Sequence, residues 1–262
     1  MNDDNWFYLE FLKRILIGSV SVSIQSEFWN AKKWPKMSFV KYIVKQPVSY
    51  AFEHGGPTWA TNSHTMICLT GLNQINESLD YINLNNIEGD LLEAGVWRGG
   101  ACIFMKMYCK LYNLKKKIYV CDSFQGIPAV DAAKYPQDAG MEDWSGIAAV
   151  SQKDVVNTFK HYDIQLDDSV VFVPGWFCDS LPNLQVDKLS LLRLDGDLYS
   201  STMDVLKPLY PKVVENGVII IDDYSWTNCA HAVNDYLTIN SIEADIKNDE
   251  EPAYWIKQGE TK

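Results

Sequence analysis

The chain has 262 residues, 47% of them hydrophobic, and a formal net charge of -11. The length fits one large domain, and the hydrophobic fraction is that of a globular core. The acidic excess argues against a nucleic-acid-binding protein, because such proteins set basic side chains against phosphates. A neutral or cationic small molecule, or a divalent metal ion, is the expected partner.

The N-terminal stretch MNDDNWFYLEFLKRILIGSVSVSI predicts an amphipathic helix near residues 6–17 that docks on the body of the protein. Its first residues are acidic, and Lys13 and Arg14 interrupt the apolar run. It therefore matches neither a secretory signal nor a membrane span. The six cysteines show no CxxC pair or other zinc spacing, which favours reduced thiols in a cytoplasmic protein.

The rhythm of the chain changes at residue 89. Residues 1–88 are irregular apart from the first helix and a second near 64–85, whereas strands and helices alternate through residues 89–262. Alternation of this kind predicts a mostly parallel sheet with helices on both faces. The strands are expected near 89–96, 116–124, 169–176, 188–197 and 216–224, with a closing pair at 244–248 and 253–258.

Between two of these elements, segment 127–150 carries prolines, acids and glycines. We expect a long loop there, of the kind that covers a site. A helix is predicted after it, from residue 152, with Ser151 as its N-cap.

Glycines and acids follow the first two strands, at the edge where open α/β sheets bind ligands. In the run EAGVWRGG, Gly95 permits close approach of the backbone to a ligand, and Glu93 suits a ligand with an ammonium group. The spacing is not the GxGxxG of dinucleotide sites. Asp122, after the second strand, could accept hydrogen bonds from both hydroxyls of a ribose. Simple packing of the glycines and turn capping by Asp122 are the alternatives.

Four more acids follow the fourth and fifth strands, which are Asp195, Asp197, Asp222 and Asp223. Because these strands end at the same edge, we expect the carboxylates to share a small volume and to repel each other. A hard cation such as Mg²⁺ or Ca²⁺ would relieve that repulsion, since it prefers oxygen ligands. Asp197 is expected to point elsewhere or to cap the next helix, which leaves the other three as metal ligands.

Six segments in this order resemble the macrocin-type sugar O-methyltransferases of antibiotic biosynthesis: LLEAGVWRGGACIFM, VCDSFQGIP, AVSQKDVVNTF, VPGWFCDSLP, LRLDGDLYSSTMDVLKPLYPKV and GVIIIDDY. The resemblance covers roughly residues 6–258. It implies an α/β class I methyltransferase fold, with a Rossmann-like seven-stranded sheet and an N-terminal helical lid over residues 1–88. It also implies S-adenosylmethionine and Mg²⁺ as cofactors, and a homo-oligomer.

The resemblance assigns roles to individual residues. Glu93 and Gly95 would hold the methionine part of the cofactor, and Asp122 its ribose. Asp195, Asp222 and Asp223 match the metal ligands, and Asp195 also matches the general base. The full set implied for cofactor binding is Thr65, Met66, Asn73, Glu93, Gly95, Val96, Asp122, Ser123, Ser151 and Trp176.

The function predicted on these grounds is Mg²⁺-dependent transfer of a methyl group to a hydroxyl of a sugar or glycosylated natural product. N-methylation of an amine is the alternative on the same fold. A nicotinamide-dependent oxidoreductase is disfavoured by the missing GxGxxG. The family often has an arginine where Ala230 stands and an aspartate where Asn234 stands, so the identity of the acceptor is left open.

Overall fold

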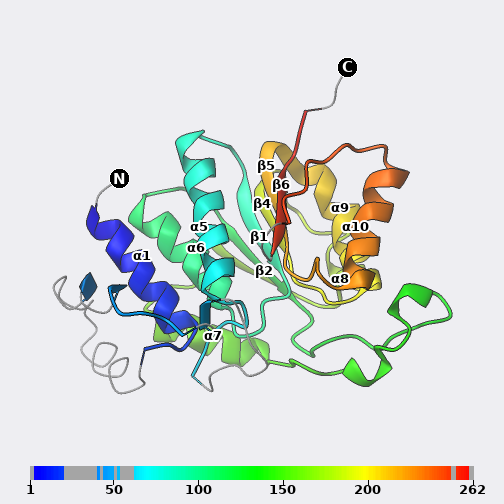
Figure 1. The fold of residues 1–262 in the computed structure, drawn as a ribbon, viewed down its shortest axis with the longest axis horizontal. Coiled ribbons are helices and arrows are strands. Elements are labelled where there is room, and N and C mark those ends of the chain that lie inside the picture. Colours follow the sequence, from blue (N-terminus) through cyan, green and yellow to red (C-terminus); the bar gives the residue numbers. More distant parts are fainter. Residues whose placement is uncertain are drawn as a thin grey trace.

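A computed structural model describes residues 3–20, 40–41, 44–49, 52–53, 62–248 and 252–259. Within these ranges a six-stranded sheet carries helices on both faces (Figure 1). Its strands are β1 (Asp90–Ala94), β2 (Ile118–Asp122), β3 (Val170–Pro174), β4 (Leu189–Leu194), β5 (Val213–Ile221) and β6 (Ala253–Ile256). The helices are α1 (Asp3–Leu16), α5 (Leu69–Leu84), α6 (Gly100–Leu111), α7 (Gln152–His161), α8 (Phe177–Ser180), α9 (Tyr199–Leu209) and α10 (Thr227–Ile239).

The strand order is β3-β2-β1-β4-β5-β6, and β1 to β5 run parallel. The chain winds outward from β1 in one direction and then continues from β4 in the other. The order therefore reverses between β1 and β4, which is where ligands bind in sheets of this type. The predicted α/β architecture with helices on both faces is confirmed.

The prediction of seven strands is wrong. Of the expected closing pair, only the second segment forms a strand, β6, which is antiparallel to β5. Residues 244–248 make a single bridge, in which Lys247 exchanges two backbone hydrogen bonds with Tyr254. Asp245 and Asn248 belong to the residue types that strands disfavour. The expected closing pair is therefore one strand with a one-residue contact on its outer side.

Residues on successive positions of each strand enter opposite apolar layers. Leu91 and Leu191 pack with α1, α5, α6 and α7 on one face, whereas Leu92 and Leu192 pack with α9 and α10 on the other. This alternation follows from the two-residue period of a strand, with both faces buried. It explains why the strand sequences are almost entirely apolar.

Helix α1 confirms the prediction of an amphipathic helix docked on the body. Leu9, Leu12 and Leu16 are buried, and α1 packs against α6 and α5 within the same apolar layer (Figure 1). A lid role for residues 1–88 is not confirmed by this packing. Much of the remaining N-terminal segment lies outside the described residues. Among the described helices, none is both long and apolar enough to cross a membrane.

Candidate active site

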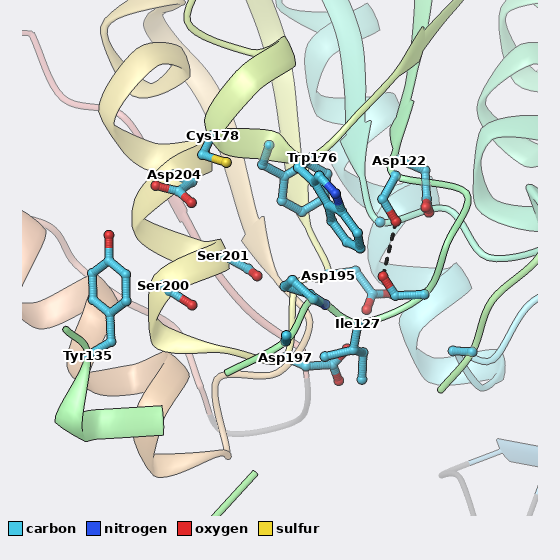
Figure 2. A pocket seen from close by; sticks show the side chains of 18 of the residues that line it. Asp122, Ile127, Tyr135, Trp176, Cys178, Asp195, Asp197, Ser200, Ser201 and Asp204 are labelled. Atoms are coloured by element: carbon cyan, nitrogen blue, oxygen red, sulfur yellow. Dashed lines mark hydrogen bonds between the residues drawn. The ribbon is translucent and has the colours of Figure 1, made fainter. Parts of the chain in front are cut away.

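A cavity of about 440 Å³ lies beyond the carboxyl ends of β1, β2 and β4. One end is formed by Asp122 and Trp176, and the other by Tyr135, Cys178, Ser200 and Asp204, with Asp195 and Asp197 between them (Figure 2). Loop 127–150 supplies part of the wall, including Ile127, Lys134 and Tyr135. The loop predicted to cover a site thus forms part of a cavity wall.

Gly95 allows the ends of β1 and β4 to meet. Its φ is +89°, and a Cβ atom added there would lie 1.7 Å from the carbonyl oxygen of Asp195. Backbone hydrogen bonds continue past the strands, from Asp195 to Ala94 at 2.8 Å and from Gly95 to Cys121 at 2.9 Å. Any other residue at this position would separate the two strand ends, so the glycine is required by the geometry of the site.

Asp122 is fixed by the backbone at its end of the cavity. Its carboxylate accepts hydrogen bonds from the N–H groups of Val96, at 2.8 Å, and Phe124, at 2.7 Å. Burial raises the pKa of Asp122, and these donors act in the opposite direction. Val96 thus contributes its backbone to the orientation of Asp122. Trp176 lies near Asp122 at this end of the cavity (Figure 2), and its ring offers an apolar surface to a flat group.

The segment before α5 passes over the N-terminus of α6. The N–H of Gly100 donates to the carbonyl of His64 at 2.9 Å, and a Cβ atom at Gly100 would lie 2.4 Å from that oxygen. His64 in turn shares a 2.6 Å hydrogen bond with Tyr162. These contacts bring Met66 into the cavity wall and bury Thr65 beside α6.

Three carboxylates form a cluster at the strand ends, and two of them, Asp195 and Asp197, line the cavity. One oxygen from each of Asp195, Asp197 and Asp223 lies within 4.8 Å of the others. Burial, followed by the charges of Asp222 and Asp223, raises the pKa of Asp195 well above its usual range. Burial also raises the pKa of Asp197 to about 6. Oxygen donors at this spacing fit a hard divalent cation, which would offset their repulsion.

The prediction that Asp197 points away from the cluster or caps the next helix is wrong. Its left-handed backbone, with φ of 58°, turns the carboxylate back into the cavity, while its N–H donates to Asp223 at 3.0 Å. The buried Asp138, from loop 127–150, takes the capping position instead. It accepts hydrogen bonds from the N–H groups of Tyr199, at 2.6 Å, and Ser200, at 3.0 Å.

Arg193 lies behind the cluster and is 1% exposed. Its guanidinium bonds Glu93 at 2.6 Å, Asp195 at 3.1 Å and Asp222 in a short contact. Asp222, a predicted metal ligand, therefore directs one oxygen to Arg193. One buried cation thus joins carboxyl groups from three neighbouring strands.

Several residues of the implied cofactor set lie away from the cavity wall. Glu93 is 2% exposed, and its second oxygen accepts a hydrogen bond from Cys102 at 2.8 Å. Asn73 accepts one from Lys13 at 2.9 Å. Ser151 caps α7, as predicted, by accepting from the N–H of Asp154 at 3.2 Å. Cofactor binding by these three side chains stays a prediction, whereas Gly95, Asp122, Ser123 and Trp176 do line the cavity.

The sequence reasoning missed two residues that hold the cavity and the cluster in place, Arg193 and Asp138. Arg193 had a visible signal, because it is the charged residue within the otherwise apolar run LSLLRL, and a buried charge needs partners. Asp138 had none, since its partners on α9 are about sixty positions away and loop acids are common. A charge inside a buried strand can be read from sequence, but a tether between distant segments cannot.

Comparison with known proteins shows which family the sequence resembles. The model of the macrocin O-methyltransferase (TylF) family matches residues 5–257. Demethyldecarbamoylnovobiocin O-methyltransferase of Streptomyces niveus is 37% identical over 97% of this chain and 94% of its own length. Mycinamicin III 3''-O-methyltransferase of Micromonospora griseorubida is 39% identical over 76% of this chain and 81% of its own.

Solved structures similar to this chain are also methyltransferases. The O-methyltransferase NovP superposes with a TM-score of 0.80 at 34% identity, covering 97% of this chain and 100% of the other. A calicheamicin methyltransferase, at 16% identity, shares the fold with a TM-score of 0.63 over 91% of each chain. The chain belongs to the macrocin O-methyltransferase family, and it is an S-adenosylmethionine-dependent methyltransferase.

Proposed function

We propose that this protein transfers the methyl group of S-adenosylmethionine to a hydroxyl of a sugar carried by a natural product, with Mg²⁺ as a second cofactor. The observation that carries the proposal is the position of the Asp195, Asp197 and Asp223 cluster. Two of its members, Asp195 and Asp197, line the same cavity as Asp122 and Trp176, which suit a nucleoside. A methyl donor and a cation can therefore meet at one acceptor.

The cofactor is assigned to the end of the cavity at Asp122. The carboxylate there would bind the ribose hydroxyls with the lone pairs that Val96 and Phe124 leave open. Trp176 would cover the adenine, and Gly95 would allow the methionine part to lie against the backbone. This orientation directs the sulfonium toward Asp195.

The reaction forms a bond from the acceptor oxygen to the methyl carbon and breaks the bond from that carbon to sulfur, which keeps the electron pair. Asp195 is the group placed to take the hydroxyl proton, since its carboxylate faces the cavity beyond Gly95. Bound Mg²⁺ would lower the pKa of the hydroxyl and fix its direction. Asp195 and Asp223 would hold it, with Asp222 or Asp197 as the third carboxylate.

Hydroxyl transfer is favoured over N-methylation. The relatives from Streptomyces niveus and Micromonospora griseorubida are both O-methyltransferases. An amine also becomes a nucleophile by losing a proton and needs no cation, so an acidic metal cluster would serve no purpose in its reaction.

The test is incubation of the purified protein with methyl-labelled S-adenosylmethionine and extracts of glycosylated metabolites, followed by mass spectrometry. We expect a labelled methyl ether on a sugar, loss of labelling in excess EDTA, and recovery with added Mg²⁺. Label on nitrogen would contradict the assignment of the acceptor atom. Full labelling in EDTA would contradict the metal requirement.

A further inference from the structure

Arg193 holds one oxygen of Asp195 and one oxygen of Asp222. From this we propose that Arg193 determines the cation specificity of the site, by restricting these carboxylates to single-oxygen coordination and so favouring Mg²⁺ over Ca²⁺. The inference rests on the proposed metal dependence and adds a role that the site residues themselves do not have.

The contacts are specific to single oxygens. Nη1 of Arg193 lies 3.1 Å from Oδ2 of Asp195, and Nη2 donates to Oδ1 of Asp222. The guanidinium is planar, so two contacts from one fork fix the relative rotation of both carboxylates. The strand ends that carry them are also joined, since the N–H of Asp222 donates to Leu194 at 2.8 Å.

Asp223 follows the same pattern with a different donor. Its Oδ2 accepts a hydrogen bond from the N–H of Asp197 at 3.0 Å. In each of the three predicted ligands, therefore, one oxygen already has a protein partner. The other oxygen of each remains for a cation. Two-oxygen coordination by Asp195 or Asp222 would place the cation against an oxygen that Arg193 already holds, close to the positive guanidinium.

Glu93 makes this arrangement possible. A buried arginine directly behind a cation site would repel the cation unless its own charge were offset. Oε1 of Glu93 accepts from Nη1 at 2.6 Å, and both side chains are at most 2% exposed. Arg193 is thus held in place by a carboxylate outside the cluster, which offsets the charge of the guanidinium.

The two cations differ in what they need. Mg²⁺ takes six ligands in near-ideal octahedral geometry, is satisfied by one or two carboxylates, and keeps several waters. Ca²⁺ takes six to eight oxygens and commonly uses carboxylates through both oxygens. Limiting Asp195, Asp222 and Asp223 to one free oxygen each removes ligands that Ca²⁺ would use and none that Mg²⁺ requires.

The experiment measures cation binding directly, without turnover. Mn²⁺, which suits the same octahedral oxygen sites as Mg²⁺, is titrated into the full-length protein and followed by electron paramagnetic resonance. Bound Mn²⁺ is then displaced with Mg²⁺ or Ca²⁺. The variants are Arg193→Lys, whose single ammonium cannot hold two carboxylates at once, and the double variant Arg193→Met with Glu93→Gln. The double variant avoids leaving the buried carboxylate of Glu93 without its cationic partner.

A matched control is Lys188→Met, which removes a cation outside the cavity whose ammonium pairs with Glu88 at 3.0 Å. In the unmodified protein and this control, we expect Ca²⁺ to need at least tenfold higher concentration than Mg²⁺ to displace Mn²⁺. In both Arg193 variants we expect that ratio to fall at least tenfold, through tighter Ca²⁺ binding, with circular dichroism unchanged.

An unchanged ratio in variants that fold and bind Mn²⁺ would overturn the role of Arg193 and leave the proposed function standing. Loss of Mn²⁺ binding from both folded variants would overturn it too, because Arg193 would then be needed to build the site rather than to limit it. If the unmodified protein binds no Mn²⁺, the proposed metal dependence itself fails.

Discussion

The two ends of the cavity are built in different ways. At one end Asp122 and Gly95 stand on strand ends, and backbone hydrogen bonds of 2.7–2.9 Å hold them in place. At the other end Lys134 and Tyr135 come from loop 127–150, which reaches the core through Asp138. The first arrangement follows from the sheet, so it suits the invariant cofactor. The second depends on side chains and can change with the acceptor.

The carboxylate cluster joins the two ends, and its loss should have the largest effect. Replacement of Asp195 by Asn removes both the proposed proton acceptor and a charge of the cation site. We expect kcat to fall at least 10²–10⁴-fold, the range for general acid–base residues. Steady-state assays with labelled cofactor measure this. Asp131→Asn is the control, because Asp131 lines the cavity outside the cluster. Turnover within tenfold of the unmodified protein would exclude Asp195 as base.

A substitution at the strand-built end should weaken cofactor binding, whereas a substitution at the far end should leave it unchanged. Asp122→Asn loses charged hydrogen bonds worth about 1.5–3 kcal/mol each, so we expect the Kd for S-adenosylmethionine to rise roughly ten- to hundredfold. Asp204→Asn, in the wall opposite Trp176 (Figure 2), should leave that Kd within about twofold. Titration calorimetry measures this Kd for both variants. Equal increases in Kd would contradict the assignment of the cofactor to the Asp122 end.

The loop-built end should lose stability and acceptor affinity when Asp138, which ties loop 127–150 to α9, is replaced. Asp138→Ala deletes the acceptor for the N–H groups of Tyr199 and Ser200. Loss of such a cap costs about 0.5–2 kcal/mol, and the loop loses its anchor on α9. We expect a lower free energy of unfolding, a KM for the acceptor raised several-fold, and an unchanged Kd for the cofactor. Asp143→Ala, an exposed acid of the same loop, is the control. A weaker cofactor affinity in the Asp138 variant would show that the ends are coupled.

The same contrast explains what could be read from the sequence. The strand ends were predictable because apolar runs locate β1 to β5, and parallel topology brings their ends together. This placed Asp122, Asp195 and Gly95 correctly. The direction of a side chain after a strand was not predictable, because the left-handed residue at Asp197 reverses it. The extent of pairing between β6 and residues 244–248 was not predictable either, because pairing at the edge of a sheet depends on one or two contacts.

Ser151 gives the smallest effect and separates a cofactor role from a structural one. Its hydroxyl accepts from the N–H of Asp154 and donates to its carboxylate at 2.7 Å, and the residue is exposed at the start of α7. Ser151→Ala should therefore lower the free energy of unfolding by about 1 kcal/mol, with the Kd for S-adenosylmethionine unchanged. Ser151→Thr should restore most of the stability, because Thr is also a preferred N-cap and keeps a hydroxyl that can donate to Asp154. Denaturant titration and calorimetry give both quantities. A raised Kd in Ser151→Ala at normal stability would instead support the cofactor contact implied by the family, and would extend the strand-built end of the cavity to α7.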